Sequence, residues 1–372
     1  MKNIVSYAED NLDTLAARPF GGVDSLILSW VSYLHFPLGV PSLHNWVGVP
    51  LKDLFRAEYF PQLFQGVWDK ENSRRLFTAL AASPRFRDVQ LMGFTEQVDP
   101  GQEKQFAALT FRLAPDLCYV AFRGTDSSLV GWKEDFNMAF QHPVPSQTEA
   151  ARYLTTVASH CAGALLTGGH SKGGNLAVYS AAAVSPQIQA RVRKVYSHDG
   201  PGFLETFLQT PGFLAIEPKI EKTLPQSSVV GLLLTHREDC QVVRSNRQSL
   251  LQHDPFSWIV EETAFSYDQL TADAKYWDRT LDDWLRRLSA EERERFVESL
   301  YSILSSVDIA DFAEFRTGWQ KNLPALMHAA ANLDPDTRLF LFRVIKELAS
   351  VSLRNFPERL RDHPDLSVPP QA

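Results

Sequence analysis

The chain has 372 residues, of which 44% are hydrophobic and 22% are charged, so it can bury a large core. Its formal net charge is -7 and it has no run of Lys or Arg, which argues against a nucleic-acid partner. The cysteines Cys118, Cys161 and Cys240 show no metal-ligand spacing, and their odd number does not suit a disulfide set, so we expect reduced thiols. Composition thus predicts an ordinary globular protein.

The amino end lacks the pattern of a secretion signal. Acidic residues such as Glu9 and Asp10 stand where a signal peptide would have its apolar run. The most apolar early stretch, residues 23–38, contains Asp24 and is too short and too polar to cross a bilayer. We therefore expect a cytoplasmic protein without a transmembrane segment.

The hydrophobic pattern divides the chain into three parts. Residues 1–85 are rich in aromatic side chains, interrupted by prolines, and predict a mostly helical cover. Residues 86–266 alternate short apolar runs with helical segments, which indicates an α/β core around a mainly parallel sheet. Residues 267–372 are helical in pattern, and we expect an appendage whose Leu, Phe and Trp side chains form core rather than ligand contacts.

Within these parts, short elements are predicted in chain order. Strands are expected at 89–94, 106–113, 117–122, 164–168, 194–198 and 229–234, and helices at 147–160 and 175–184. Residues 289–292 form a capping-box pattern before an amphipathic helix that runs through Leu304. Pro335 is placed to be the first residue of another helix, which runs through Leu353.

One short motif points to chemistry. Residues 169–173, Gly-His-Ser-Lys-Gly, fit G-x-S-x-G and lie between a predicted buried strand and a helix of small residues. In that context the serine sits on a tight, strained turn that projects its hydroxyl above the sheet, and the flanking glycines avoid clashes. The alternative is a plain glycine turn. The context favours an α/β-hydrolase fold with Ser171 as the nucleophile.

Two backbone amides could bind a negatively charged oxygen beside this serine. Lys172 begins the helix, so its N–H is free and directed at the site, and its side chain need not take part. Thr125 follows the strand 117–122 and offers both an N–H and a hydroxyl at the same edge of the sheet. For Thr125 the alternative is an ordinary turn at a strand end.

A possible lid follows this loop. Trp132, Phe136 and Phe140 recur at every fourth position with charged residues between them, which predicts an amphipathic helix. Such a helix could cover an apolar pocket or simply pack inward from the surface, and the spacing alone favours neither.

The general base should follow the nucleophile in the chain, if the usual order of this fold holds. The candidates are His198, His236, His253, His328 and His363. We favour His253, because it lies in a polar loop beyond the last predicted core strand, where this fold places its base. Two carboxylates, Asp199 and Asp239, each follow a predicted strand and could hold the histidine, and spacing alone leaves both open.

These residues resemble the class 3 lipases. In that family an F-R-G-[ST] loop precedes a Trp-bearing lid segment and G-H-S-x-G-G, followed later by D-x-V-x near a strand end and by a loop His with a Trp after it. The corresponding residues here are 122–125, Trp132, 169–174, 239–242, and His253 with Trp258. One departure is Lys172, which replaces an apolar residue of the lipases and argues against a triglyceride-type apolar mouth.

The chain resembles more closely the Mbeg1-like family of predicted bacterial hydrolases, formerly described as a domain of unknown function. Its G-H-S-K-G-G-N and D-G-P-G-F motifs stand here at residues 169–175 and 199–203. Its early segment is similar to residues 20–33. This resemblance covers most of the chain, the C-terminal helices included, and implies the α/β-hydrolase fold.

The class 3 lipase pattern also implies roles for individual residues. By that pattern Ser171 is the nucleophile, His253 the base and Asp239 the acid, in preference to Asp199. It implies an oxyanion hole formed by Thr125 and the N–H of residue 172.

These roles imply hydrolysis of a carboxyl ester, from a small molecule or a lipid, through an acyl-enzyme intermediate, without metal or organic cofactor. Aromatic residues near the lid would allow peripheral contact with a membrane. The alternatives are a thioesterase, an amidase or an acyltransferase with the same triad, or a non-catalytic binding module of hydrolase fold. Nothing in the sequence bears on the oligomeric state.

Overall fold

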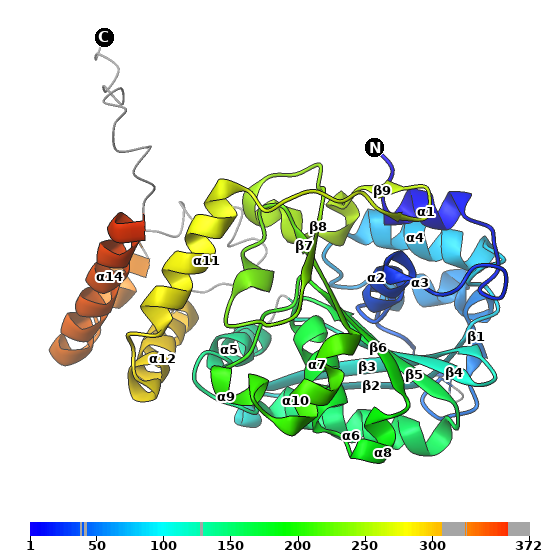
Figure 1. Ribbon diagram of the computed structural model, residues 1–372, viewed down its shortest axis with the longest axis horizontal. Helices are drawn as coiled ribbons and strands as arrows, with labels where there is room; N and C mark the ends of the chain where they lie inside the picture. The colour runs from blue at the N-terminus through cyan, green and yellow to red at the C-terminus, as the bar shows by residue number, and fades with distance from the viewer. Residues whose placement is uncertain (38, 41–42, 127–128, 307–323, 325, 356–372) are drawn as a thin grey trace, which may run out of the picture.

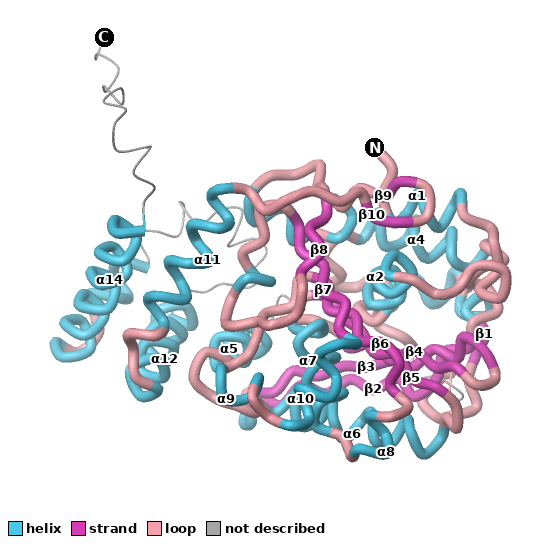
Figure 2. Tube along the Cα trace, viewed as in Figure 1, coloured by secondary structure: helices cyan, strands magenta, loops and turns pink. Residues whose placement is uncertain are grey.

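The computed structural model describes residues 1–37, 39–40, 43–126, 129–306, 324 and 326–355. Figure 1 shows a central twisted sheet with helices on both of its faces and the C-terminal helices standing at one side. Figure 2 shows how loops join the sheet to these helices over the upper part of the molecule.

The strands of the main sheet lie side by side in the order in which they occur in the chain. They are β1 (Val49–Pro50), β2 (Gln90–Asp99), β3 (Lys104–Ala114), β4 (Leu117–Phe122), β5 (Ala164–His170), β6 (Val192–His198), β7 (Ile220–Pro225) and β8 (Cys240–Val243). Neighbours from β1 to β4 are antiparallel, and neighbours from β4 to β8 are parallel. The mainly parallel sheet and the α/β-hydrolase fold predicted from the sequence are confirmed.

Helices cover the two faces of the sheet in separate sets. Crossovers between sequential parallel strands have one hand, so the connecting helices fall on one face. These are α6 (Pro145–His160), α7 (Lys172–Ala183), α8 (Pro186–Gln189), α9 (Glu205–Leu208) and α10 (Pro211–Ile216) (Figure 1). The opposite face is left for the N-terminal helices, which are α1 (Ile4–Asp10), α2 (Gly22–Val31), α3 (Phe60–Leu63) and α4 (Lys70–Ala82).

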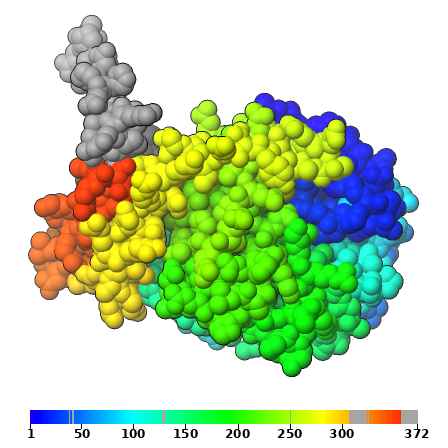
Figure 3. Space-filling model, in the orientation of Figure 1, coloured from blue at the N-terminus to red at the C-terminus, as the bar shows by residue number. Residues whose placement is uncertain are grey.

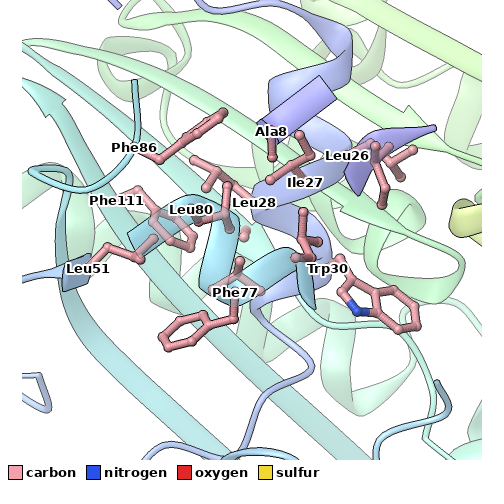
Figure 4. Packing of buried hydrophobic residues seen from close by; sticks show 14 of the residues in the cluster. Ala8, Leu26, Ile27, Leu28, Trp30, Leu51, Phe77, Leu80, Phe86 and Phe111 are labelled. Atoms are coloured by element: carbon pink, nitrogen blue, oxygen red, sulfur yellow. The ribbon is translucent and has the colours of Figure 1, made fainter. Parts of the chain in front are cut away.

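Side chains of the central strands alternate between these two layers. In β4, Cys118, Val120 and Phe122 join the apolar cluster that includes α6 and α7, whereas Tyr119 and Ala121 join the cluster formed with the N-terminal helices. This is the period of two expected for a strand that is buried on both faces. Figure 4 shows part of the N-terminal cluster, in which side chains of α2 and α4 pack together above the sheet.

A buried ion pair ties the N-terminal helices together. Arg85 follows α4, and its guanidinium donates to both carboxylate oxygens of Asp24 in α2, at 2.7 and 2.6 Å. The hydroxyl of Tyr7 in α1 donates to the same carboxylate at 2.9 Å.

A later segment of the chain also contacts the N-terminal region. The amide of Val260 in β9 (Val260–Glu261) donates to the carbonyl of Lys2. In Figure 3 this later segment crosses the top of the molecule to reach the N-terminal region.

The C-terminal helices form a layer beyond the sheet. They are α11 (Ala272–Leu285), α12 (Ala290–Ser306) and α14 (Pro335–Asn355), and they share a small apolar cluster that includes Trp284 and Val344. The predicted capping box is present, since Ser289 and Glu292 exchange hydrogen bonds between side chain and amide. Pro335 is the first residue of α14, as predicted. In the described part of the chain, no helix is both long and apolar enough to cross a membrane.

One predicted strand is wrong. Residues 229–234 contain only a short 3-10 helix, Val230–Leu232, and the strand that pairs with β6 is β7 at Ile220–Pro225. The apolar run was misleading because Val230, Leu233 and Leu234 line a cavity. The true strand was overlooked because it carries Lys222, a buried lysine whose ammonium lies 3.4 Å from Glu238. The other predicted strands coincide with β2 to β6.

We expect Arg85→Met to lower the free energy of unfolding by about 3–5 kcal/mol, because it leaves the Asp24 carboxylate buried without its ionic partner. Chemical denaturation measures this value. The matched control is Lys2→Met, which removes the exposed pair of Lys2 with Asp10 and should cost less than about 1 kcal/mol. Equal losses in both variants would contradict the structural role of the buried pair.

Candidate active site

Ser171 occupies a strained turn between β5 and α7. Its φ is 58° and its ψ is -133°, a backbone conformation that residues other than glycine rarely adopt. The flanking glycines are required by close packing. A Cβ at Gly169 would lie 2.2 Å from the backbone of Gly173, and a Cβ at Gly173 would lie 2.1 Å from the carbonyl oxygen of Phe122. The turn therefore has the geometry that the G-x-S-x-G motif predicts.

The carboxyl ends of three adjacent strands bring candidate residues to one edge of the sheet. Thr125 follows β4, Ser171 follows β5 and Asp199 follows β6, and these strands are hydrogen-bonded neighbours. Ligands of open α/β sheets bind at this edge. The topology thus collects a hydroxyl, a carboxylate and helix-terminal amides in one place.

His253 is held by Asp199. The Nδ1–H of His253, at the end of a 3-10 helix (Ser249–His253), donates to Oδ2 of Asp199 over 2.6 Å. The other oxygen of Asp199 accepts from the hydroxyl of Ser228 at 2.5 Å and the amide of Gly231 at 3.1 Å. Asp199 is fully buried and has a φ of 50°. With Nδ1 engaged in this way, Nε2 is the ring nitrogen left to accept a proton.

Asp239, which the lipase pattern favoured over Asp199, lies elsewhere. It precedes β8 at Cys240, so it stands at the amino end of a parallel strand, at the sheet edge opposite to that of Ser171. The mistaken strand at 229–234 had made Asp239 look like a residue after a strand. The geometry therefore corrects the preference: Asp199 contacts His253, and the position of Asp239 excludes such a contact.

The other histidines lie in different surroundings. His198 is buried, with its ring nitrogens bonded to Thr223 and Ser25, and burial lowers its pKa to about 3. Burial and the charge of Lys222 lower the pKa of His236 to about 4. His328 pairs with Asn332 in a C-terminal helix. His363 lies outside the described residues.

His170 and Tyr33, whose roles the sequence did not single out, form a chain of hydrogen bonds to His253. Nε2 of His170 donates to the carbonyl oxygen of His253 at 2.8 Å, which leaves its Nδ1 to accept from the hydroxyl of Tyr33 at 3.2 Å. Burial lowers the pKa of His170 well below its usual value, so the ring stays neutral. The only sequence signal for Tyr33 was that it ends the early segment resembling the Mbeg1-like family.

The side chain of Lys172 is buried against the core. Lys172 is the first residue of α7, so its amide has no partner within the helix. Its side chain is 1% exposed, and its ammonium donates to Glu134 and to the carbonyl of Gln105, each at 3.0 Å. The charge of Lys172 therefore does not make the mouth of the site polar, contrary to the expectation from its departure from the lipase pattern.

The predicted amphipathic helix exists as α5 (Leu129–Asn137), and it is anchored to the core. Glu134, fully buried, accepts hydrogen bonds from the amides of Gln105 and Ser146 as well as from Lys172. Trp132 and Phe136 border the cavity above Ser171. A buried carboxylate that accepts three hydrogen bonds restrains the helix that carries it. α5 is therefore firmly attached to the core of the protein.

Asp135 links α5 to the loop of Thr125. The hydroxyl of Thr125 donates to Oδ2 of Asp135 at 2.5 Å. Burial raises the pKa of Asp135 to about 6, against the opposing effects of Lys172 and the Thr125 hydroxyl. This carboxyl was not predicted as a site residue, since its neighbours in the sequence show only a helical pattern.

Ser171 and His253 open into one cavity of about 440 Å³. Aromatic and aliphatic side chains line much of it, among them residues of α2, α5, α11 and α12. Within the described residues, the Ser171 hydroxyl forms no hydrogen bond with His253, and such bonds often tighten only when substrate is bound. The described residues also contain no group of three or more His, Cys, Asp or Glu side chains arranged to hold a metal ion.

The Mbeg1-like family matches residues 80–302, more than half of the chain. The chain belongs to the Mbeg1-like family. The matched region of this Mbeg1-like protein begins in α4 and ends within α12, so it includes β2 to β8, α5, α11 and most of α12. No curated protein matches the sequence.

Several solved lipase structures are similar to part of this chain. A fungal lipase in complex with an inhibitor has 14% identity and a TM-score of 0.37, covering 59% of this Mbeg1-like chain and 77% of its own. The propeptide complex of Rhizomucor miehei lipase has 16% identity and a TM-score of 0.32, covering 53% and 67%. M37 lipase has 13% identity and a TM-score of 0.33, covering 56% and 68%.

The raised pKa of Asp135 predicts a pH effect on stability. The folded protein binds this proton more tightly than the unfolded chain, so the free energy of unfolding should fall as the pH rises from the ordinary carboxyl pKa of 3.8 to about 6. Asp135→Asn should remove this fall, which amounts to at most about 3 kcal/mol.

Urea unfolding of wild type and variant across this pH range measures the difference. Asp53→Asn, at an exposed position outside the cavity, is the control and should follow the wild-type curve. Parallel curves for wild type and Asp135→Asn would contradict the prediction.

Proposed function

We propose that this Mbeg1-like protein is a serine hydrolase that cleaves carboxyl esters, with Ser171 as nucleophile, His253 as base and Asp199 as acid. The observation that carries the proposal is the 2.6 Å hydrogen bond between Nδ1 of His253 and Asp199, in a cavity that also contains the strained Ser171. A buried carboxylate that orients an imidazole near a serine on such a turn is the arrangement that activates a serine for acyl transfer.

The proposed reaction begins with proton transfer. His253 takes the hydroxyl proton of Ser171 on Nε2 while Oγ attacks the ester carbonyl. Asp199 keeps the imidazole in the required tautomer and stabilises the imidazolium. His253 then gives the proton to the departing alcohol, and the acyl group remains on Ser171. Water, deprotonated in turn by His253, attacks the acyl-enzyme and releases the acid.

The negative charge on the carbonyl oxygen would be bound by two amides. One belongs to Lys172, at the positive end of the dipole of α7, and the other to Thr125. The Thr125 hydroxyl is engaged by Asp135, and this bond fixes the conformation of the loop that carries the amide. Donors oriented before the reaction cost no reorganisation when the charge develops.

Labelling with a fluorophosphonate, read by intact mass, tests for an activated serine. We expect one adduct on wild type, none on Ser171→Ala, and none on His253→Ala within the time that labels wild type fully. Absence of an adduct on folded wild type, with detergent or lipid present as well as without, would reject the hydrolase and favour a binding module.

Two aspartate variants test the identity of the acid. Asp199→Asn should lower kcat for p-nitrophenyl butyrate by about 10⁴-fold, because the imidazole loses its tautomer control. Asp239→Asn is the matched control and should stay within about twofold of wild type, since surface substitutions away from special contacts have little effect. The reverse ranking in this ester assay would overturn the assignment of Asp199.

A further inference from the structure

We propose that α11 and α12 form the acyl-binding wall of the site and select esters of long, uncharged acyl chains. This inference rests on the proposed ester hydrolysis at Ser171. The inference adds which part of the substrate the C-terminal helices bind and which residues limit the length of the acyl chain.

The C-terminal helices line the same cavity as the nucleophile. From α11 and the turn after it come Leu281, Trp284, Leu285 and Leu288. From α12 come Phe296, Val297 and Leu300. Across from them, Trp132 and Phe136 of α5 complete an apolar channel that reaches Ser171. The sequence predicts that the apolar residues of this region form core rather than ligand contacts. Trp284 and Leu288 do belong to the apolar cluster of the C-terminal helices, and they also line the cavity.

Polar contacts hold α12 against α5. Lys133 of α5 lies 3.1 Å from Glu298 of α12, and its ammonium stands 4.6 Å from the ring centre of Tyr301. Arg293 near the start of α12 donates to the carbonyl of Ala139, just after α5, at 3.2 Å. The wall is therefore attached at both ends of the contact with α5, and its apolar side chains face the cavity between these attachments.

The charged group in this wall is already engaged. Arg293 borders the cavity, but its Nε and Nη2 donate to the carbonyl of Leu285 at 3.0 and 2.6 Å, and its Nη1 donates to Ala139. These bonds use three of the five N–H groups of the guanidinium and hold it against the backbone. The other side chains of α11 and α12 that line the cavity are Leu, Trp, Phe and Val, so we expect the chain bound along them to be a hydrocarbon.

The size and composition of the cavity suit such a chain. Its volume of about 440 Å³ lies in the range of sites that enclose small organic ligands. Each methylene group buried in an apolar site raises the binding affinity by up to about fourfold. Since the acyl chain stays bound from the ester to the transition state, kcat/KM should rise with chain length until the channel is filled.

The test measures kcat/KM of the full-length protein for p-nitrophenyl acetate, butyrate, octanoate and dodecanoate. Wild type should prefer octanoate or dodecanoate to acetate by at least about tenfold. Leu300→Trp, which fills the channel, should lower the dodecanoate-to-butyrate ratio by about tenfold or more, as expected when two methylenes lose their site. Phe296→Ala, which widens it, should shift the preference to longer chains.

Leu339→Trp is the matched control, since Leu339 on α14 is 68% exposed and lies outside the cavity lining. It should leave the ratio unchanged. Equal ratios in wild type, Leu300→Trp and Phe296→Ala, with butyrate still hydrolysed, would overturn the inference and leave the proposed function standing. Absence of hydrolysis of every ester, together with absence of fluorophosphonate labelling, would overturn the proposed function and with it this inference.

Discussion

The close approach of α7 to the ends of β4 and β5 is the constraint on which the site depends. There is no room for a side chain at residue 173, because the backbone of Phe122 lies against it. This contact forces the turn at Ser171 into its strained conformation and sets the first amide of α7 above the strand ends, beside the loop of Thr125. The buried hydrogen bond between Lys172, at the start of α7, and Glu134 of α5 then fixes the position of α5 relative to α7. One packing contact thus orients the serine, the amides and a wall of the cavity.

Much of this arrangement could be predicted from the sequence. The glycines around Ser171 are recognisable because their function is steric and local, and the strands β4 and β5 are recognisable because both of their faces are apolar. Less could be predicted where a charged side chain is buried together with a partner of opposite charge. β7 carries Lys222, whose charge is compensated by Glu238 from a later segment, so its pattern does not look like that of a buried strand. Because β7 was missed, a strand was expected at residues 229–234 instead. Asp239 then seemed to follow the end of a strand, which favoured it as the acid.

Long-range proximity explains the remaining differences. Asp199 and His253 are 54 positions apart, and only the sheet topology and the loop after β8 bring them together. Tyr33 reaches the site from the turn just after α2, a helix on the opposite face of the sheet from α7, and no local pattern reveals this. The C-terminal helices show an amphipathic pattern, but that pattern does not tell whether the apolar side packs against core or encloses a cavity.

The closing of the cavity by α11 and α12 also affects how the protein behaves in water. A chain that ended before Ala272 would leave Trp132, Phe136 and Leu233 on an open apolar surface around the nucleophile. Patches of this kind larger than several hundred Å² promote association and adsorption to interfaces. The C-terminal helices thus cover apolar side chains around Ser171 that a shorter chain would expose to water.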